Sequence, residues 1–224
     1  MRDLIQQERF EIEVLDRLNS RRLLSQLIFT GGTMLRLCYG LNRFSVDLDF
    51  WVGRRLRYAA LFAKLRESLA ELYTITDCAR KFYTLLYELK SPDYSRRLKI
   101  EIRSGPRRVK TEMAIAYSQF TTTQVLVRVP ALPEIMAAKV AAFLSRREVR
   151  DAFDIEFLLK RGVPLPDEPE RLKGLLSGLE RLSDQDYKVQ LGSLLTAEFR
   201  RYYTKENFRL LKMAIAERLN RVRV

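Results

Sequence analysis

Residues 27–50 read LIFTGGTMLRLCYGLNRFSVDLDF, and this stretch decides the fold. A short apolar run, 26–30, stops at two adjacent glycines, as a strand does when it enters a tight turn. Residues 33–40 predict a short helix that ends at Gly40. The alternating residues 46–52 then predict a second strand. The stretch therefore indicates a strand, a glycine turn, a helix and another strand in direct succession.

The glycine turn has the properties of an anion site. Gly31 and Gly32 lack side chains, so backbone N–H groups can come close to a bound anion. The N-terminus of the following helix adds a favourable dipole, and Thr33 adds a hydroxyl group. The same pair of glycines is common before helices in proteins that bind nothing there. By itself the turn therefore indicates only a strand-to-helix connection.

Asp47 and Asp49 are separated by one residue on the second predicted strand. Side chains two residues apart point to the same face of a strand, which leaves Leu48 and Phe50 for a buried face. Two carboxylates held side by side repel each other unless a cation lies between them. Mg²⁺ or Mn²⁺ suits carboxylate oxygens combined with substrate phosphates. The pair therefore predicts a divalent-metal site; the alternative is a strand with a solvent-facing polar side.

A third carboxylate is available on a later strand-like run, 96–103. The isoleucines of this run face one way, while Glu101 faces the other way with Lys99 and Arg103. If the run lies beside residues 46–50, Glu101 can complete the metal site. Three carboxylates and two metal ions suit nucleotidyl transfer, where metals activate the attacking oxygen and steady the leaving pyrophosphate. Alternatively, Lys99 and Arg103 are simple ion-pair partners of Glu101.

The rest of the chain changes character near 129–133. The pattern predicts an α/β (α+β) fold, with a mixed β-sheet and flanking helices in a domain 1–130 and an all-helical C-terminal domain 131–224. In the first domain we expect helices at 4–18 and 57–72, strands near 81–89, 96–103 and 123–129, and a basic loop at 103–108. In the second we expect helices across 133–162, 168–182, 187–201 and 205–222.

Composition narrows the classes of function. The 224 residues include 41 Lys and Arg, 28 Asp and Glu and no histidine, for a net charge of +13. This charge favours nucleic acid or nucleotide phosphates as partners over a merely basic surface. The lack of histidine excludes Ser-His-Asp and Cys-His triads and His-ligated zinc. No apolar run is long enough to predict a membrane span, and two cysteines without metal-binding spacing leave a cytoplasmic location as the default.

Two motifs resemble a known family. The pattern G-G-T followed by S-x-D-x-D resembles the signature of the nucleotidyltransferase-fold superfamily, and residues 31–50 resemble its AbiEii/AbiGii toxins of type IV toxin–antitoxin systems. A second signature of that family, K-x-x-A-x-x-x-R followed by R-D-x-x-D, is similar to the residues Lys139, Ala142, Arg146, Arg150, Asp151 and Asp154. Together the motifs span about half of the chain in the expected order.

The resemblance implies a role for each matching residue. The nucleoside triphosphate would be held by Gly31, Gly32, Thr33, Arg43, Ser45, Lys139 and Arg150. The catalytic residues would be Asp47, Asp49, Glu101, Lys139 and Asp154, with the metal ions on the first three.

The second motif also has a plain structural interpretation. Asp154, or else Asp151, would act at the site or orient Lys139 and Arg150. However, Arg150 and Asp154 are spaced i,i+4, as are Arg147 and Asp151, and such spacing is typical of ordinary pairs on a helix surface.

The leading hypothesis is a metal-dependent enzyme that moves a nucleoside monophosphate (NMP) from a nucleoside triphosphate (NTP) to an acceptor. The resemblance implies that the acceptor is RNA, including the 3′ end of tRNA, and that a partner antitoxin restrains the enzyme. One alternative is a catalytically inactive module on the same fold that binds RNA or protein. Another is NMP transfer to a protein side chain or a small molecule. No membrane partner is expected.

Overall fold

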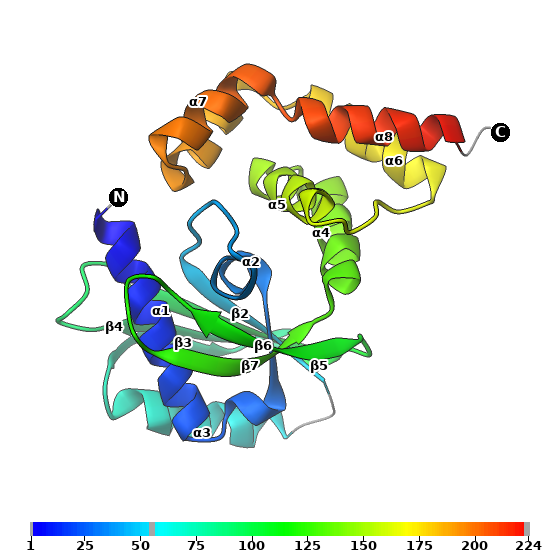
Figure 1. The fold of residues 1–224 in the computed structure, drawn as a ribbon. Coiled ribbons are helices and arrows are strands. Elements are labelled where there is room, and N and C mark those ends of the chain that lie inside the picture. The colour runs from blue at the N-terminus through cyan, green and yellow to red at the C-terminus, as the bar shows by residue number, and fades with distance from the viewer. Residues whose placement is uncertain (1, 54–56, 222–224) are drawn as a thin grey trace. The chain divides into compact units, whose positions relative to one another are not determined.

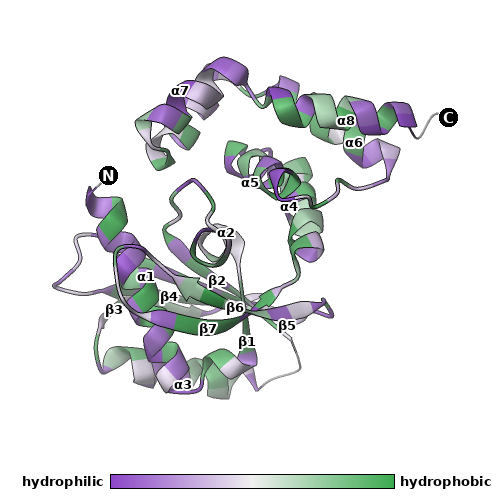
Figure 2. Ribbon diagram, in the orientation of Figure 1, coloured by the Kyte–Doolittle hydropathy of each residue, from purple (hydrophilic) through white to green (hydrophobic). Residues whose placement is uncertain are grey.

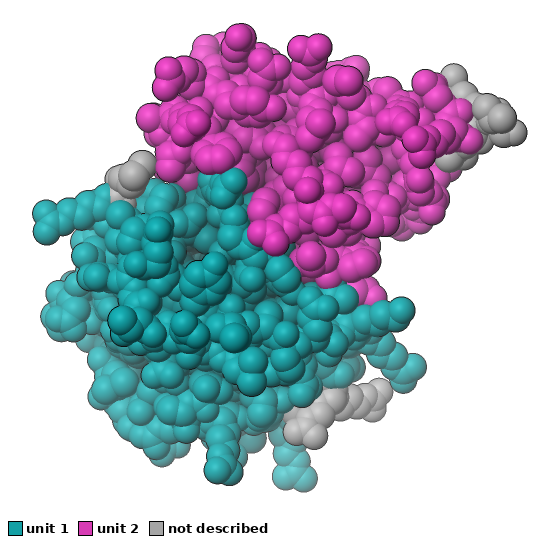
Figure 3. All heavy atoms as spheres, in the orientation of Figure 1, with its two compact units in different colours: residues 1–131 teal, residues 132–224 magenta. Residues whose placement is uncertain are grey.

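The computed structural model describes residues 2–53 and 57–221. The chain forms two compact units, Met1–Ala131 and Leu132–Val224, which Figure 3 shows in different colours. Within the described residues, every helix is too short or too polar to cross a membrane.

Unit 1 is a mixed α/β structure. Its helices are α1 (Arg2–Ser20), η1 (Leu24–Gln26), α2 (Gly31–Tyr39) and α3 (Tyr58–Ala70). Its strands are β1 (Leu27–Thr30), β2 (Asp47–Val52), β3 (Thr74–Arg80), β4 (Thr84–Lys90), β5 (Leu98–Pro106), β6 (Thr111–Tyr117) and β7 (Gln124–Pro130). Five strands form one sheet in the order β1-β2-β5-β4-β3, and β6 pairs with β7 in a separate hairpin (Figure 1). The sheet is mixed because β2 runs parallel to β5, whereas the other three pairs of neighbouring strands in this sheet are antiparallel.

The strands form because their apolar residues alternate. Ile100 and Ile102 on β5 are fully buried, as is Tyr87 on the neighbouring β4. The hydroxyl group of Tyr87 donates a hydrogen bond to the carbonyl oxygen of Phe62 in α3, at 2.9 Å. Along α1 and α3, hydrophobic and hydrophilic residues alternate in Figure 2, as expected for helices with one face on a core. The face of the sheet that carries Ile100, Ile102 and Tyr87 therefore packs in the core of unit 1.

Some sequence expectations for unit 1 are wrong. The basic loop expected at 103–108 does not begin at Arg103, because β5 continues to Pro106. Strands β3 and β6 were not expected. Both lie at an edge of their sheet, and β3 has only a weak alternation of buried and exposed residues. Most residues of these two strands are exposed, so few apolar side chains mark a buried face.

Unit 2 is helical throughout its regular structure. Its elements are α4 (Leu132–Arg146), α5 (Val149–Lys160), α6 (Pro169–Glu180), a π-helical segment η2 (Asp186–Leu191), η3 (Gly192–Leu194), α7 (Ala197–Glu206) and α8 (Arg209–Arg221). The helical run expected over 133–162 is two helices, because Arg147 takes a left-handed conformation with φ of 54°. The helix expected over 187–201 is likewise divided among η2, η3 and α7.

Close packing between α4 and α6 organises the core of unit 2. A Cβ atom added at Gly178 of α6 would lie 2.7 Å from the ring of Phe143 in α4. Phe143 and Phe153 of α5 are almost completely buried. The small residue at position 178 therefore lets the two helices approach closely around a large aromatic side chain.

Candidate active site

The two aspartates project from one face of β2. Asp47 and Asp49 are half-buried, whereas the intervening Leu48 and the following Phe50 are 0% and 1% exposed. This alternation places both carboxylates on the face of β2 opposite to Leu48 and Phe50. A rigid strand thus holds the two acidic side chains next to each other.

The parallel pairing of β2 with β5 brings further charges to this face. Lys99 lies opposite Asp47, and Glu101 lies opposite Asp49. Lys99 forms an ion pair with Glu101, and this hydrogen bond raises the pKa of Lys99. The negative charges of Glu101, Asp47 and Asp49 raise it further. One ammonium group therefore lies in the field of three carboxylates, and of the two suggested partners of Glu101 only Lys99 pairs with it.

The donor set suits a hard divalent cation. Mg²⁺ is typically bound through one or two carboxylates, with substrate phosphates and water completing its coordination, and Asp47 and Asp49 offer two such groups on one strand. In the described part of the chain, no group of three or more acidic, histidine or cysteine side chains is arranged to hold a metal ion. Glu101 is bound to Lys99 instead. The aspartate pair fits a metal ion, and Glu101 as a third ligand stays a prediction.

The glycine turn lies directly against the aspartates. Gly31 has a φ of 84°, and a Cβ atom built there would lie 2.5 Å from Oδ2 of Asp49. A Cβ atom on Gly32 would lie 2.5 Å from Nη2 of Arg43 and 2.9 Å from Oγ of Ser45. The first N–H groups of a helix have no acceptor within the helix, and α2 begins at Gly31. A strand of carboxylates and a helix N-terminus therefore meet at one point.

Thr33 has a different position from the one expected of a phosphate ligand. Its hydroxyl group donates a hydrogen bond to the carbonyl oxygen of Asp47 at 2.6 Å, and the residue is 1% exposed. A phosphate oxygen accepts hydrogen bonds, but the hydroxyl proton of Thr33 is already donated to this carbonyl oxygen. Thr33 ties α2 to the start of β2 and so positions Asp47.

The segment between α2 and β2 is held by a residue that the sequence did not single out. The guanidinium group of Arg36 lies over the ring of Phe44, 3.9 Å from its centroid, and pairs with Glu8 of α1. It also donates to the carbonyl oxygens of Leu41 and Arg43 at 3.2 and 3.4 Å. Nothing in the local pattern indicates this role, because Glu8 is distant in the sequence.

Arg43 and Ser45 are close to the glycine turn by virtue of this segment. Arg43 is 3% exposed, and its Nη1 donates to the carbonyl oxygen of Phe44 at 3.0 Å. Ser45 is half-buried, with its hydroxyl group beside Gly32. Of the two, Ser45 is the more accessible to a ligand at the turn.

In unit 2 four charged residues of the second motif, Lys139, Arg146, Asp151 and Asp154, form an ion cluster between α4 and α5. Nζ of Lys139 on α4 lies 2.6 Å from Oδ2 of Asp154 and 3.2 Å from Oδ1 of Asp151, both on α5. Arg146 donates two hydrogen bonds to Asp151, at 2.7 and 2.9 Å. Both aspartates are 0% exposed. The cluster links two helices through Lys139, Asp151 and Asp154, which have little contact with water, whereas the side chain of Arg146 is 46% exposed.

The surface pairs suggested by i,i+4 spacing are not formed. Among the residues that the structure describes, Arg150 pairs with Glu148 at 2.6 Å and not with Asp154, and Arg147 does not pair with Asp151. The reason is the direction of α5, which turns Asp151 and Asp154 inward to α4. Arg150 therefore remains at the surface of the unit.

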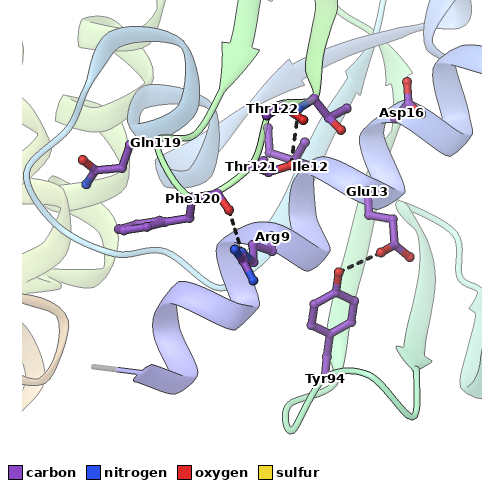
Figure 4. Close-up of a pocket in the computed structure, with 10 residues that line it drawn as sticks. Arg9, Ile12, Glu13, Asp16, Tyr94, Gln119, Phe120, Thr121 and Thr122 are labelled. Carbon is purple, nitrogen blue, oxygen red and sulfur yellow. Dashed lines mark hydrogen bonds between the residues drawn. The ribbon is translucent and has the colours of Figure 1, made fainter.

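A separate hollow of about 610 Å³ lies in unit 1 and contains none of the predicted site residues. It is bounded by α1, the segment before β5 and the turn between β6 and β7. In Figure 4, Arg9 donates to the carbonyl oxygen of Phe120, and the hydroxyl group of Tyr94 donates to Glu13. These contacts tie the three segments together.

Two crystal structures from Helicobacter pylori share this architecture. One is of a protein assigned as a nucleotidyltransferase, with 22% sequence identity over 96% of each chain and a TM-score of 0.63. The other, JHP933, is 21% identical over 96% of each chain, with a TM-score of 0.53. No curated protein sequence matches the chain. The likeness shows that the chain has the nucleotidyltransferase fold, a mixed sheet with flanking helices.

The sequence itself narrows this class to a family. The model of the family described as "Nucleotidyl transferase AbiEii toxin, Type IV TA system" matches residues 13–217. The chain therefore belongs to the AbiEii family and is a nucleotidyltransferase. Membership in a toxin–antitoxin family implies an NTP substrate and an antitoxin partner.

Proposed function

We propose that the protein transfers an NMP from an NTP to an RNA acceptor, with the 3′ end of tRNA as the leading candidate, and that the reaction requires Mg²⁺ or Mn²⁺. One observation carries this proposal: Asp47 and Asp49 share a face of β2, and Gly31 at the start of α2 lies against Asp49. Carboxylates for a metal and a backbone site for phosphate are thus adjacent. We further propose that 1–130 is the catalytic domain and 131–224 a helical domain.

The proposed reaction balances without another reactant. A hydroxyl oxygen of the acceptor attacks the α-phosphorus of the NTP and forms a new P–O bond. The bond between the α-phosphorus and the bridging oxygen breaks, and pyrophosphate leaves. The hydroxyl proton passes to a carboxylate oxygen, for which Glu101, opposite Asp49, is the candidate. The metal, when bound, neutralises charge on the phosphates and on the attacking oxygen.

The chain's own groups would bind and orient the triphosphate. Asp47 and Asp49 would hold the metal, the N–H groups that follow Gly31 would receive phosphate oxygens, and Ser45 would add a hydroxyl donor. Thr33 would keep Asp47 in place. Arg43, largely buried beside Gly32, would lend positive charge to the turn.

The charged residues of unit 2 complete the proposal. Lys139 would contact the triphosphate, and Asp154 and Asp151 would hold its ammonium group in place, as their contacts support. Arg150 would bind nucleotide from the surface of the unit, where it pairs with Glu148. The net charge of +13 supports an acceptor with many phosphates, because each neutralised phosphate releases a counterion.

A transfer assay tests the proposal. The purified chain is incubated with each α-labelled NTP, with Mg²⁺, Mn²⁺ or a chelator, and with total RNA. We expect label on RNA with metal and none with the chelator. Label on protein alone would redirect the acceptor, and a folded wild-type chain that transfers nothing to RNA, protein or small molecules would support the inactive binding module.

A further inference from the structure

The turn between β3 and β4 exposes two aromatic side chains. Phe82 is 85% and Tyr83 is 73% exposed, and their rings meet edge to face with centroids 4.5 Å apart. Keeping two large rings in water is unfavourable, because their burial elsewhere would stabilise the fold. An exposed aromatic pair therefore suggests a surface that stacks on a partner.

Two adjoining segments beside this pair are rich in basic residues. Residues 80–84 and 103–110, here called the basic tip, include Arg80, Lys81, Arg103, Arg107, Arg108 and Lys110 and no acidic residue. The two segments adjoin, because Thr84 lies opposite Arg103 and the N–H group of Ser104 donates to the carbonyl oxygen of Tyr83 at 2.9 Å. Arg80, Lys81, Arg103 and Arg108 form no ion pair with any residue in 2–53 or 57–221. Their charges remain available to an anion.

The basic tip continues the strands that carry the candidate site. Arg103 and Glu101 are two residues apart on β5 and share a face, so they are about 7 Å apart along the strand. Trp51 of β2 lies opposite Arg103, and the guanidinium group of Arg107 lies 4.8 Å from its ring. The N–H group of Arg107 also donates to the carbonyl oxygen of Val52 at 2.8 Å. A strand of nucleic acid that ends at the carboxylates can therefore reach the tip.

We propose that the basic tip binds the single-stranded end of the acceptor RNA, with bases stacked on Phe82 and Tyr83 and phosphates on the surrounding cations. Exposed aromatic faces combined with positive charge are the usual means of binding single strands, because every base has a face that can stack. A duplex hides these faces, so the tip selects unpaired nucleotides. This inference rests on the proposed transfer to RNA.

Binding measurements without any NTP test the inference separately from catalysis. A fluorescently labelled single-stranded RNA is titrated with the wild-type chain and with Phe82→Ala/Tyr83→Ala. We expect on the order of tenfold weaker binding for the variant, because the bases can no longer stack on the two rings. The control is Met113→Ala/Tyr117→Ala, which removes two exposed apolar side chains from β6, and we expect its affinity to be unchanged. Thermal unfolding confirms that each variant is folded.

A second pair of variants tests the charges. Arg80→Ala/Lys81→Ala should weaken binding and lower the dependence of log affinity on log salt by roughly 0.7 for each phosphate that the variant no longer neutralises. Unchanged RNA affinity in both tip variants, or an equal loss in the β6 control, would overturn the inference and leave an acidic protein as the partner. Weaker RNA binding in the tip variants would uphold the surface even if the wild type transferred no nucleotide, which would remove only the proposed function.

Discussion

Two charged clusters differ in their access to water. On the face of β2 and β5, Asp47 and Asp49 are half-buried, and Lys99 is the ammonium group in their field. Between α4 and α5, Asp154 is fully buried and held by Lys139 at 2.6 Å. Charges that keep contact with water can exchange one partner for another at low cost. Charges fully removed from water depend on the partner they already have.

We infer that the cluster on β2 and β5 binds a ligand, whereas the cluster between α4 and α5 stabilises the fold. We propose that a bound divalent cation relieves the repulsion between Asp47 and Asp49, so that this pair serves ligand binding. The charges of Lys139 and Asp154 compensate each other at a distance of 2.6 Å, so this ion pair contributes mainly to holding α4 on α5. The following variants test this division, from the largest expected effect to the smallest.

Neutralising the aspartates should abolish transfer without unfolding the chain. If Asp47 and Asp49 hold the metal as proposed, Asp47→Asn and Asp49→Asn each remove a ligand worth several kcal/mol of transition-state stabilisation, so we expect about a thousandfold loss of rate. The free energy of unfolding should change little, because both half-buried side chains keep contact with water. Asp77→Asn on exposed β3 is the control and should keep full activity. Steady-state transfer rates and thermal unfolding measure both effects, and a fully active Asp47→Asn would refute the assignment.

Breaking the buried pair should instead destabilise the fold. Asp154→Ala leaves Lys139 with one carboxylate fewer in a dry environment, which we expect to cost about 3 kcal/mol of unfolding free energy. Lys139→Met/Asp154→Leu removes both charges and should recover most of that loss. Arg150→Ala, at a half-exposed pair, should change stability by less than about 1 kcal/mol. Denaturant unfolding measures each value, and equal stability of Asp154→Ala and the wild type would contradict the buried-pair interpretation.

The same double variant tests whether Lys139 also serves catalysis. If Lys139 contacts the triphosphate as proposed, the folded Lys139→Met/Asp154→Leu variant should lose transfer activity at least about tenfold. Full activity in this stable variant would confine the cluster to a structural role.

Alanine variants at two glycines distinguish the effect of backbone strain from the effect of a steric clash. Gly31 and Gly162 have φ of 84° and 82°, but only Gly31 has an obstacle to a side chain, 2.5 Å away at Asp49. Gly162→Ala should cost about 1–2 kcal/mol of stability from its left-handed backbone alone, with unchanged transfer. Gly31→Ala should cost at least as much and also reduce transfer, because Asp49 must move. Similar transfer rates in the two variants would argue against a role of the glycine turn in phosphate binding.

Glu11 of α1 has a carboxyl group buried in the core of unit 1. It is 0% exposed, and within the described residues neither of its oxygens has a hydrogen-bond partner. Burial raises its pKa well above 4.5, and the negative charges of Glu8 and Asp47 add to this effect while Arg36 and Arg96 oppose it.

The raised pKa has a definite consequence for stability. The folded chain keeps the proton of Glu11 at a pH where the unfolded chain has lost it, so the stability contributed by the protonated group falls as pH rises from about 4.5 through the folded pKa. Glu11→Gln cannot lose a proton, and its stability relative to the wild type should therefore increase over that range. Denaturant titrations at several pH values measure the difference, and a difference independent of pH would contradict the buried, protonated state.

Residues 27–50 alone were sufficient to predict a strand, a turn, a helix ending at Gly40 and a strand with two aspartates on one face. These features depend on local periodicity and on the backbone freedom of glycine, which a sequence records directly. Strands β3 and β6 were missed because most of their residues are exposed and few apolar side chains mark a buried face. The helical pattern over 133–162 was continuous, and the left-handed backbone of Arg147 divides it into two helices.

Only the tertiary structure decided which groups meet. It placed β5 beside β2 so that Lys99 lies among the carboxylates, assigned the hydroxyl proton of Thr33 to Asp47, and turned Asp154 inward to Lys139. Such contacts join residues distant along the chain, and they depend on register and on the direction of a helix. Periodicity shows which face a side chain takes, but packing alone determines what that face meets.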